Sequence, residues 1–185
     1  MKGLVFILSI LCLAVGCHAP PPQSVSQAIT AMANCGSRGQ FDKSIQVGED
    51  WLRKHPEDGE NSGTLFQQIA LVYLMKASKT PAHTEENVGR AVDYLDRALA
   101  AARRKEVSLD LYEIGRGFEL AGDITGLNKC TYYRRAVQAF EDQSPLLQGE
   151  TVTAAGRTLP LASARRDNEK ALAGSRAKLG AADCR

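Results

Sequence analysis

The stretch VGRAVDYLDRALAAA, residues 88–102, decides the fold class of this chain. Its apolar residues recur at intervals of three and four, which is the spacing of one face of an α-helix. These residues are Val88, Ala91, Val92, Leu95, Ala98, Leu99 and Ala102. Charged residues lie mostly between them, as on an amphipathic helix that buries one stripe against a core. We therefore expect a long helix here.

The same spacing continues on both sides of this stretch. It predicts helices over residues 25–37, 41–54, 63–78, 86–105, 108–121, 131–143 and 160–179. We expect no strand after residue 24, because no apolar run alternates with a period of two. Gly149, Gly156 and their polar neighbours predict a loop over residues 146–158, and Pro160 is expected in the first turn of the last helix. The predicted fold class is all-α.

Two regions of the chain superpose when the sequence is shifted by 45 residues. The shift places Phe66 on Leu111, Ile69 on Ile114, Ala70 on Gly115, Tyr73 on Phe118, Val88 on Tyr133, Ala91 on Ala136, Val92 on Val137 and Leu95 on Phe140. A fixed period over two helices indicates a helix-pair repeat. Helical periodicity by itself also supplies some of these matches.

The units resemble tetratricopeptide repeats. The residues that carry the resemblance are Gly39-Gln40-Phe41, Ser44, Gly48, Trp51 and Pro56 in one unit, and Gly115, Phe118 and Gly122-Asp123 in another. The resemblance covers residues 25–145 and implies a short solenoid of about three antiparallel helix pairs. The first helix lacks the family's aromatic residue and leucine, and the later units carry inserted loops. A longer helix-pair relative, such as Sel-one-like repeats, is the alternative.

A stack of helix pairs has a concave groove lined by the first helix of each pair, which the family uses to bind peptides and partner helices. The groove-facing residues that this implies are Ile29, Ala33, Gln67, Leu71, Leu74, Tyr112, Arg116 and Glu119. Alternatively, Leu71 and Leu74 are ordinary core residues. The last helix has a thin apolar stripe and is expected either to cap the stack or to dock loosely.

The N-terminal residues resemble the signal of a bacterial lipoprotein. Lys2 gives a positive start, and the apolar run from Leu4 to Val15 is shorter than the about 20 residues that span a bilayer. Leu13-Ala14-Val15-Gly16-Cys17 resembles a lipobox, which implies that Cys17 carries the lipid anchor. A plain cleaved signal that leaves Cys17 as a thiol is the alternative. His18 stands where an inner-membrane retention signal usually has Asp, so the resemblance favours the outer membrane, facing the periplasm.

The chain therefore divides into four parts. They are the signal and lipidated cysteine (1–17), a proline-rich tether (18–24), the helix-pair domain (25–145), and a loop with a capping helix (146–185). The three consecutive prolines of the tether favour a stiff, extended spacer.

Three cysteines follow Cys17, namely Cys35, Cys130 and Cys184. Export places them where disulfides persist. We expect any disulfide to join Cys130 to Cys184 and to leave Cys35 inside the first repeat. A regular stack separates Cys35 from Cys130 by more than the ~7 Å between Cα atoms that a bridge allows. Three free thiols, or pairing of Cys184 with another molecule, are the alternatives.

No motif of a catalytic, metal or cofactor site is found in the sequence. CxxC, HExxH and a glycine-rich phosphate loop are absent, and we expect neither an enzyme nor a cofactor. Adjacent carboxylates such as Glu49-Asp50 are expected to lie on a solvated face, because consecutive helical residues do not face each other. The net charge of +2 offers no basic face for nucleic acid.

The expected function is that of a membrane-tethered scaffold that binds another envelope protein or peptide. The resemblance implies assembly of the outer membrane, of pili or of a secretion system. A helical lipoprotein that binds a small molecule is the alternative, and a hydrolase with an unrecognised site is a second one.

Overall fold

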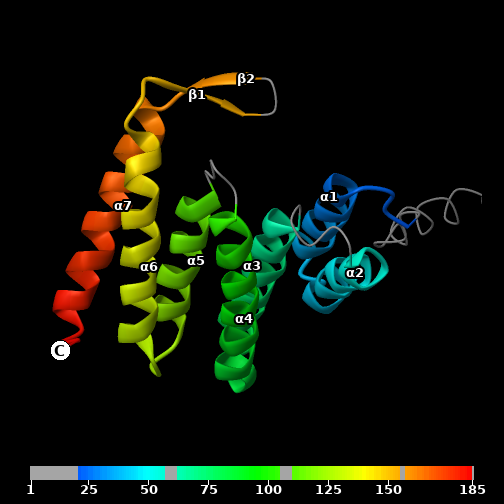
Figure 1. Cartoon of the computed structure of the whole chain (residues 1–185). Coiled ribbons are helices and arrows are strands. Elements are labelled where there is room, and N and C mark those ends of the chain that lie inside the picture. The colour runs from blue at the N-terminus through cyan, green and yellow to red at the C-terminus, as the bar shows by residue number, and fades with distance from the viewer. Residues whose placement is uncertain (1–20, 57–61, 105–109, 155–156, 185) are drawn as a thin grey trace, which may run out of the picture.

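The structure, a computed structural model, describes residues 21–56, 62–104, 110–154 and 157–184 (Figure 1). Its elements are α1 (Val25–Gly36), α2 (Phe41–Lys54), α3 (Gly63–Lys79), the 3₁₀ turn η3 (Pro81–His83), α4 (Thr84–Arg103), α5 (Asp110–Ile124), α6 (Lys129–Gln143), the 3₁₀ turn η4 (Ser144–Leu147), β1 (Thr151–Ala154), β2 (Arg157–Pro160) and α7 (Ala162–Ala181). The prediction of an all-α chain is confirmed, with one short hairpin added. Within the described ranges, no helix combines the length and the hydropathy needed to cross a membrane.

The first helix shows how local sequence sets the boundaries. Ser24 Oγ accepts a hydrogen bond from the Gln27 backbone N–H at 3.2 Å, and Gln27 Oε1 accepts one from the Gln23 N–H at 2.8 Å. These two bonds satisfy amide groups that the start of a helix leaves without partners. After α1, Gly39 adopts a φ of 71°, which glycine reaches without steric cost, and the chain turns into α2.

The helices pack as neighbours in chain order. α1 packs on α2, α3 on α4 and α5 on α6, while α3 also contacts α5, and α7 packs on α6 (Figure 1). One apolar cluster joins α1, α2 and α3 through Met32, Ile45 and Ile69. A second, larger cluster runs from α3 to α7 and includes Ile114 and Phe140. Helix α3 contributes residues to both clusters and so connects them.

Most of the residue pairs that the shift of 45 positions aligns are buried alike, although Tyr73 is only partly buried and Phe118 fully buried. Ile69 and Ile114 are both fully buried, as are Ala91 and Ala136. This agreement extends to Phe66 with Leu111, Val88 with Tyr133, and Leu95 with Phe140. The shift observed in the sequence therefore also relates positions of equal burial.

Two glycines on α5 lie opposite aromatic rings of α6. A Cβ atom on Gly115 would lie 2.6 Å from Phe140 Cε1, and one on Gly122 would lie 2.5 Å from Tyr133 Cε1. Both distances are shorter than van der Waals contact, so α5 and α6 approach closely only because these two residues have no side chain.

A β-hairpin follows α6, and the expectation of a loop over 146–158 with no strand after residue 24 is wrong here. β1 and β2 pair antiparallel, with Thr151 opposite Pro160. The β-branched run at Thr151, Val152 and Thr153 favours extended backbone, but four-residue strands are too short to show a period. Pro160 consequently ends β2 instead of beginning α7.

Helix α7 packs against α6, so the tail is docked on the other helices. Asn168 is buried, and its Nδ2 donates to the Phe140 carbonyl oxygen at 2.9 Å and to Ser144 Oγ at 3.1 Å. Ala171 and Ser175 are buried on the same face. Arg166, Glu169 and Arg176 are exposed, so α7 presents a charged surface at this end of the helices.

A disulfide joins Cys130 to Cys184, which is the pairing favoured from the sequence; their Cα atoms lie 5.4 Å apart. The carbonyl oxygen of Cys184 also accepts a hydrogen bond from Arg134 Nη2 at 3.1 Å. Cys35 is buried and takes part in a disulfide as well, whose other half lies outside the described residues. The expectation that Cys35 is left over is therefore wrong, because it rested on counting only the cysteines that follow Cys17.

Candidate binding groove

Three adjoining clefts form a groove along α3, α5 and α7. Its lining consists of Gln67, Gln68, Leu71 and Leu74 from α3; Tyr112, Glu113, Arg116, Gly117, Glu119, Leu120 and Asp123 from α5; Ser163, Ala164, Asp167, Lys170, Ala171 and Gly174 from α7; and Leu95, Gln143 and Leu147. We call this surface the groove.

The three clefts adjoin one another, since neighbouring clefts share lining residues. The cleft between α3 and α5 has a volume of about 220 Å³ and shares Arg116 and Glu119 with a cleft of about 340 Å³ between α5 and α7. That cleft shares Tyr112 and Asp167 with a third, of about 240 Å³, at the C-terminal end of α6. The three clefts thus follow one another from α3, across α5, to α7 and the end of α6.

Helical periodicity explains how each helix lines the groove. On α5 the spacing of Tyr112, Arg116, Glu119 and Asp123 is four, three and four residues, so they form one stripe. The opposite stripe of α5, which includes Ile114 and Phe118, is buried in the core. One face of the helix thus holds the fold together, and another is available to line the groove.

The residues predicted from the sequence divide into two sets. Those on α3 and α5 line the groove: Gln67, Leu71, Leu74, Tyr112, Arg116 and Glu119. Leu71 is 42% exposed, whereas Leu74 is fully buried at the base of the cleft. The two residues on α1 do not line the groove, because Ile29 packs against the first core cluster and Ala33 is exposed elsewhere.

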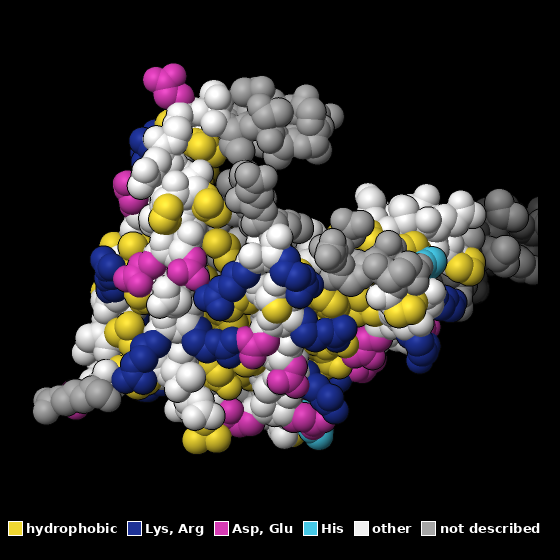
Figure 2. Space-filling view, in the orientation of Figure 1, with side chains coloured by type: hydrophobic (Ala, Val, Ile, Leu, Met, Phe, Trp, Pro, Cys, Tyr) yellow, Lys and Arg dark blue, Asp and Glu magenta, His cyan; other side chains and the backbone are white. Residues whose placement is uncertain are grey.

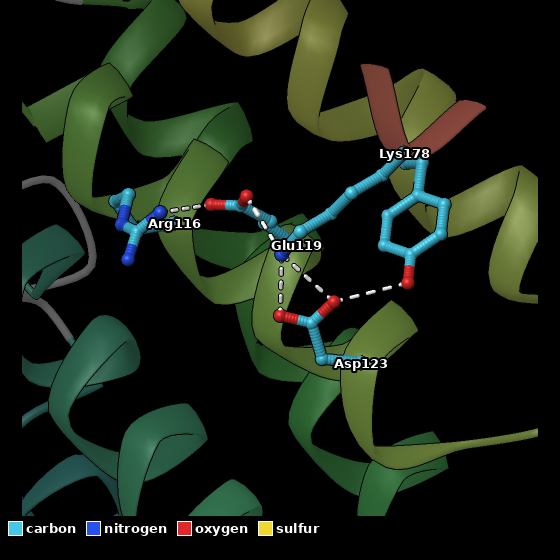
Figure 3. A network of polar contacts seen from close by, with 5 residues as sticks. Arg116, Glu119, Asp123 and Lys178 are labelled. Carbon is cyan, nitrogen blue, oxygen red and sulfur yellow. Dashed lines mark hydrogen bonds and ion pairs between the residues drawn. The ribbon is translucent and has the colours of Figure 1, made fainter. Parts of the chain in front are cut away.

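A network of charged residues crosses the middle of the groove (Figure 3). Glu119 is only 4% exposed, and its carboxylate accepts hydrogen bonds from Arg116 and, at 2.9 Å, from Lys178 Nζ. Lys178 Nζ also donates to both carboxylate oxygens of Asp123, at 2.8 and 2.6 Å, and Tyr133 Oη donates to Asp123 at 3.0 Å. Burial of the Glu119 charge requires these partners.

Lys178 connects α7 to α5 through this network. Burial, the largest single effect, lowers the pKa of its ammonium group, but the hydrogen bonds and charges of Asp123 and Glu119 outweigh it and raise the pKa overall. The ammonium group therefore stays charged at neutral pH, and α7 remains tied to the α5 side of the groove.

Charged side chains elsewhere on the molecule are also mixed in sign. Figure 2 shows a face on which Lys and Arg lie beside Asp and Glu, with hydrophobic side chains between them. Arg103 pairs with Asp142 at 2.9 Å, and the Arg135 guanidinium lies 4.1 Å from the centre of the Phe118 ring. Burial lowers the pKa of Arg135.

Glu49 lies between two tyrosines, and the expectation that it is solvated is wrong. Its Oε1 accepts hydrogen bonds from Tyr73 Oη at 3.2 Å and from Tyr94 Oη at 2.9 Å, which joins α2 to α3 and α4. Burial, together with the charge and hydrogen bond of Glu49, raises the pKa of Tyr73 to about 12 and also raises that of Tyr94. Sequence neighbours alone give no sign of this contact, because its partners are 24 and 45 residues away.

Among the described residues that line the groove there is neither His nor Cys, and Glu119 and Asp123 are both engaged by cations. Comparisons with models of protein families, with curated proteins and with solved structures find no match to this chain.

Proposed function

We propose that the mature chain is a lipid-anchored envelope protein that acts as a protein-binding scaffold, with a partner segment held in the groove. By the resemblance of its signal, the anchor is Cys17 and the address is the outer membrane, facing the periplasm. The partner is another envelope protein, in assembly of the outer membrane, of pili or of a secretion system.

The equal burial of residues 45 positions apart supports the repeat on which this proposal is built. We interpret α1 with α2, α3 with α4, and α5 with α6 as three tetratricopeptide-like pairs, and α7 as the helix that closes their stack. In such a stack the first helices adjoin one another, which agrees with the contact of α3 with α5 and with the position of the groove.

The exposure of Leu71 is the observation that carries the proposal. Leu71 is 42% exposed inside a cleft that also holds the paired charges of Arg116 and Glu119, a combination that suits the apolar and polar groups of a peptide. Met75, one helical turn further along α3, is 37% exposed. The clefts have volumes of 220–340 Å³, so two lie below the range for enclosed ligand pockets, about 300–1,000 Å³, and one lies just inside it. An extended segment therefore fits better than an enclosed small molecule.

Selection of random dodecapeptides displayed on phage tests this binding. The target is the full mature chain, and the affinity of each selected peptide is then measured against variants. If Leu71 is a central contact worth about 2 kcal/mol, Leu71→Arg weakens binding about thirtyfold. Leu127→Arg is the matched control, because Leu127 is 62% exposed and lies outside the groove. Equal effects of the two substitutions, or the absence of any selected peptide, would refute the proposal.

Lipidation is tested separately on the protein isolated from membranes. Intact mass should show acyl chains on Cys17, and Cys17→Ser should move the protein to the soluble fraction, because each buried methylene contributes about 0.8 kcal/mol to membrane binding. A sulfur atom bonded to the lipid cannot form a disulfide. Recovery of Cys17 in a disulfide-linked peptide would therefore exclude the lipid anchor.

A further inference from the structure

The end of the groove next to the C-terminus of α6 contains a buried polar atom without a partner. Gln143 is 1% exposed and borders the cleft of about 240 Å³, and its Oε1 has no hydrogen-bond partner among the described residues. A buried carbonyl oxygen that lacks a donor destabilises the protein. A ligand group that donates a hydrogen bond inside this cleft would remove that cost.

The other polar groups of this cleft also favour a donor. Asp167 is exposed, carries a negative charge and forms no ion pair with any described residue. Neither Lys nor Arg is present among the described residues that line the cleft. Asp167 therefore gives this cleft a negative charge, while Arg116 and Lys170 lie in the neighbouring cleft that Asp167 also borders.

Apolar groups supply the remaining wall. Leu147 is buried, and Ala164 lies beside it in the lining. The Tyr112 ring is held against the Phe140 ring, with their centres 5.8 Å apart. A flexible aliphatic chain packs well on such a wall, and a cation at its end is attracted to the face of a tyrosine ring.

We propose that this end of the groove is a subsite for the side chain of a lysine or arginine in the partner segment. The aliphatic part of that side chain packs on Leu147 and Tyr112, and its charged end meets Gln143 Oε1 and the Asp167 carboxylate. The subsite deepens the proposed function and rests on it, since the same segment continues along α5 towards Leu71.

The charge of the whole groove agrees with a basic partner. Its lining carries the carboxylates of Glu113, Glu119, Asp123 and Asp167 against the cations of Arg116 and Lys170. Lys178 pairs with Glu119 and Asp123, so Glu113 and Asp167 are the carboxylates that remain for a cation of the partner. Carboxylates without an ion pair favour a basic partner segment over an acidic one.

Titration of the full mature chain with three capped amino acids tests the subsite. The probes are the N-acetyl methylamides of lysine, of norleucine, which has the same aliphatic stem without the charge, and of glutamate. The NMR signal of the Gln143 side-chain amide reports on binding at pH 7. We expect saturable shifts with the lysine probe, and at least fivefold weaker binding of the norleucine and glutamate probes.

Variants then locate the binding. Asp167→Asn and Gln143→Met should each weaken binding of the lysine probe at least fivefold, and Asp167→Asn keeps the test valid if Gln143→Met disturbs folding. Glu169→Gln is the matched control, because Glu169 is exposed on the same helix but borders a different cleft. Equal binding of the norleucine probe, or equal effects of Asp167→Asn and Glu169→Gln, would overturn the subsite. If the lysine probe fails while selected peptides still depend on Leu71, the subsite is wrong and the proposed function stands.

Discussion

Removal of the disulfide between Cys130 and Cys184 should strongly destabilise the protein. The bridge spans a sequence separation of 54 residues, so it prevents a large loop from opening in the unfolded chain. In the loop-entropy model, closure of a loop of that size contributes about 4 kcal/mol at 25 °C. The loss should be concentrated at α7, whose buried side chains are Asn168, Ala171 and Ser175, one small apolar residue and two polar ones.

The double variant Cys130→Ser, Cys184→Ser tests this value, because it removes this bridge alone, whereas a reductant acts on every disulfide of the protein. Urea unfolding should show a free energy of unfolding lower by about 4 kcal/mol, and hydrogen exchange should accelerate first in α7. Arg134→Ala is the control. It removes one exposed hydrogen bond to Cys184 and should cost at most about 1 kcal/mol. A loss below 1 kcal/mol in the double variant would show that α7 is held by its packing, and the reasoning would fail.

Three further predictions concern the cores. Gly115→Ala places a Cβ atom against Phe140 and should cost about 1–3 kcal/mol, and the added Phe140→Leu should recover part of this loss in a double-mutant cycle. Trp51→Ala should cost about 3–5 kcal/mol in urea unfolding, because the side chain is only 5% exposed; a loss under 1 kcal/mol would contradict its place in the core. Because the pKa of Tyr73 is raised to about 12 in the folded state, stability should be constant below pH 10 and fall as the pH rises from 10 to 12. Tyr73→Phe should make that fall smaller, as unfolding at pH 9 and pH 11 would show.

The positions of the helices were predictable because long amphipathic runs carry a strong periodic signal. Each observed boundary lies within three residues of the predicted one, and α2 matches at both ends. The hairpin was missed because strands of four residues contain too few positions for a period of two to be recognised.

The candidate site was predictable only in part. Gln67 and Arg116 could be placed on the groove side because their helices carry a clear buried stripe on another face. The contribution of α7 to the groove could not be predicted, because the apolar stripe of this helix is thin. Its orientation depends on the pairing of Lys178 with Glu119 and Asp123, which are 59 and 55 residues away in the sequence. Interactions over such distances leave no local pattern.

The fit of Gly115 against Phe140 has a consequence for exchanging parts of this chain with other helical proteins. A Cβ atom at position 115 would lie 2.6 Å from the Phe140 ring, whereas a smaller residue at position 140 would leave a void beside Gly115. A change on either helix alone therefore leaves a clash or a void. α5 and α6 should consequently be transferred together in a chimera, with the junctions placed outside both helices.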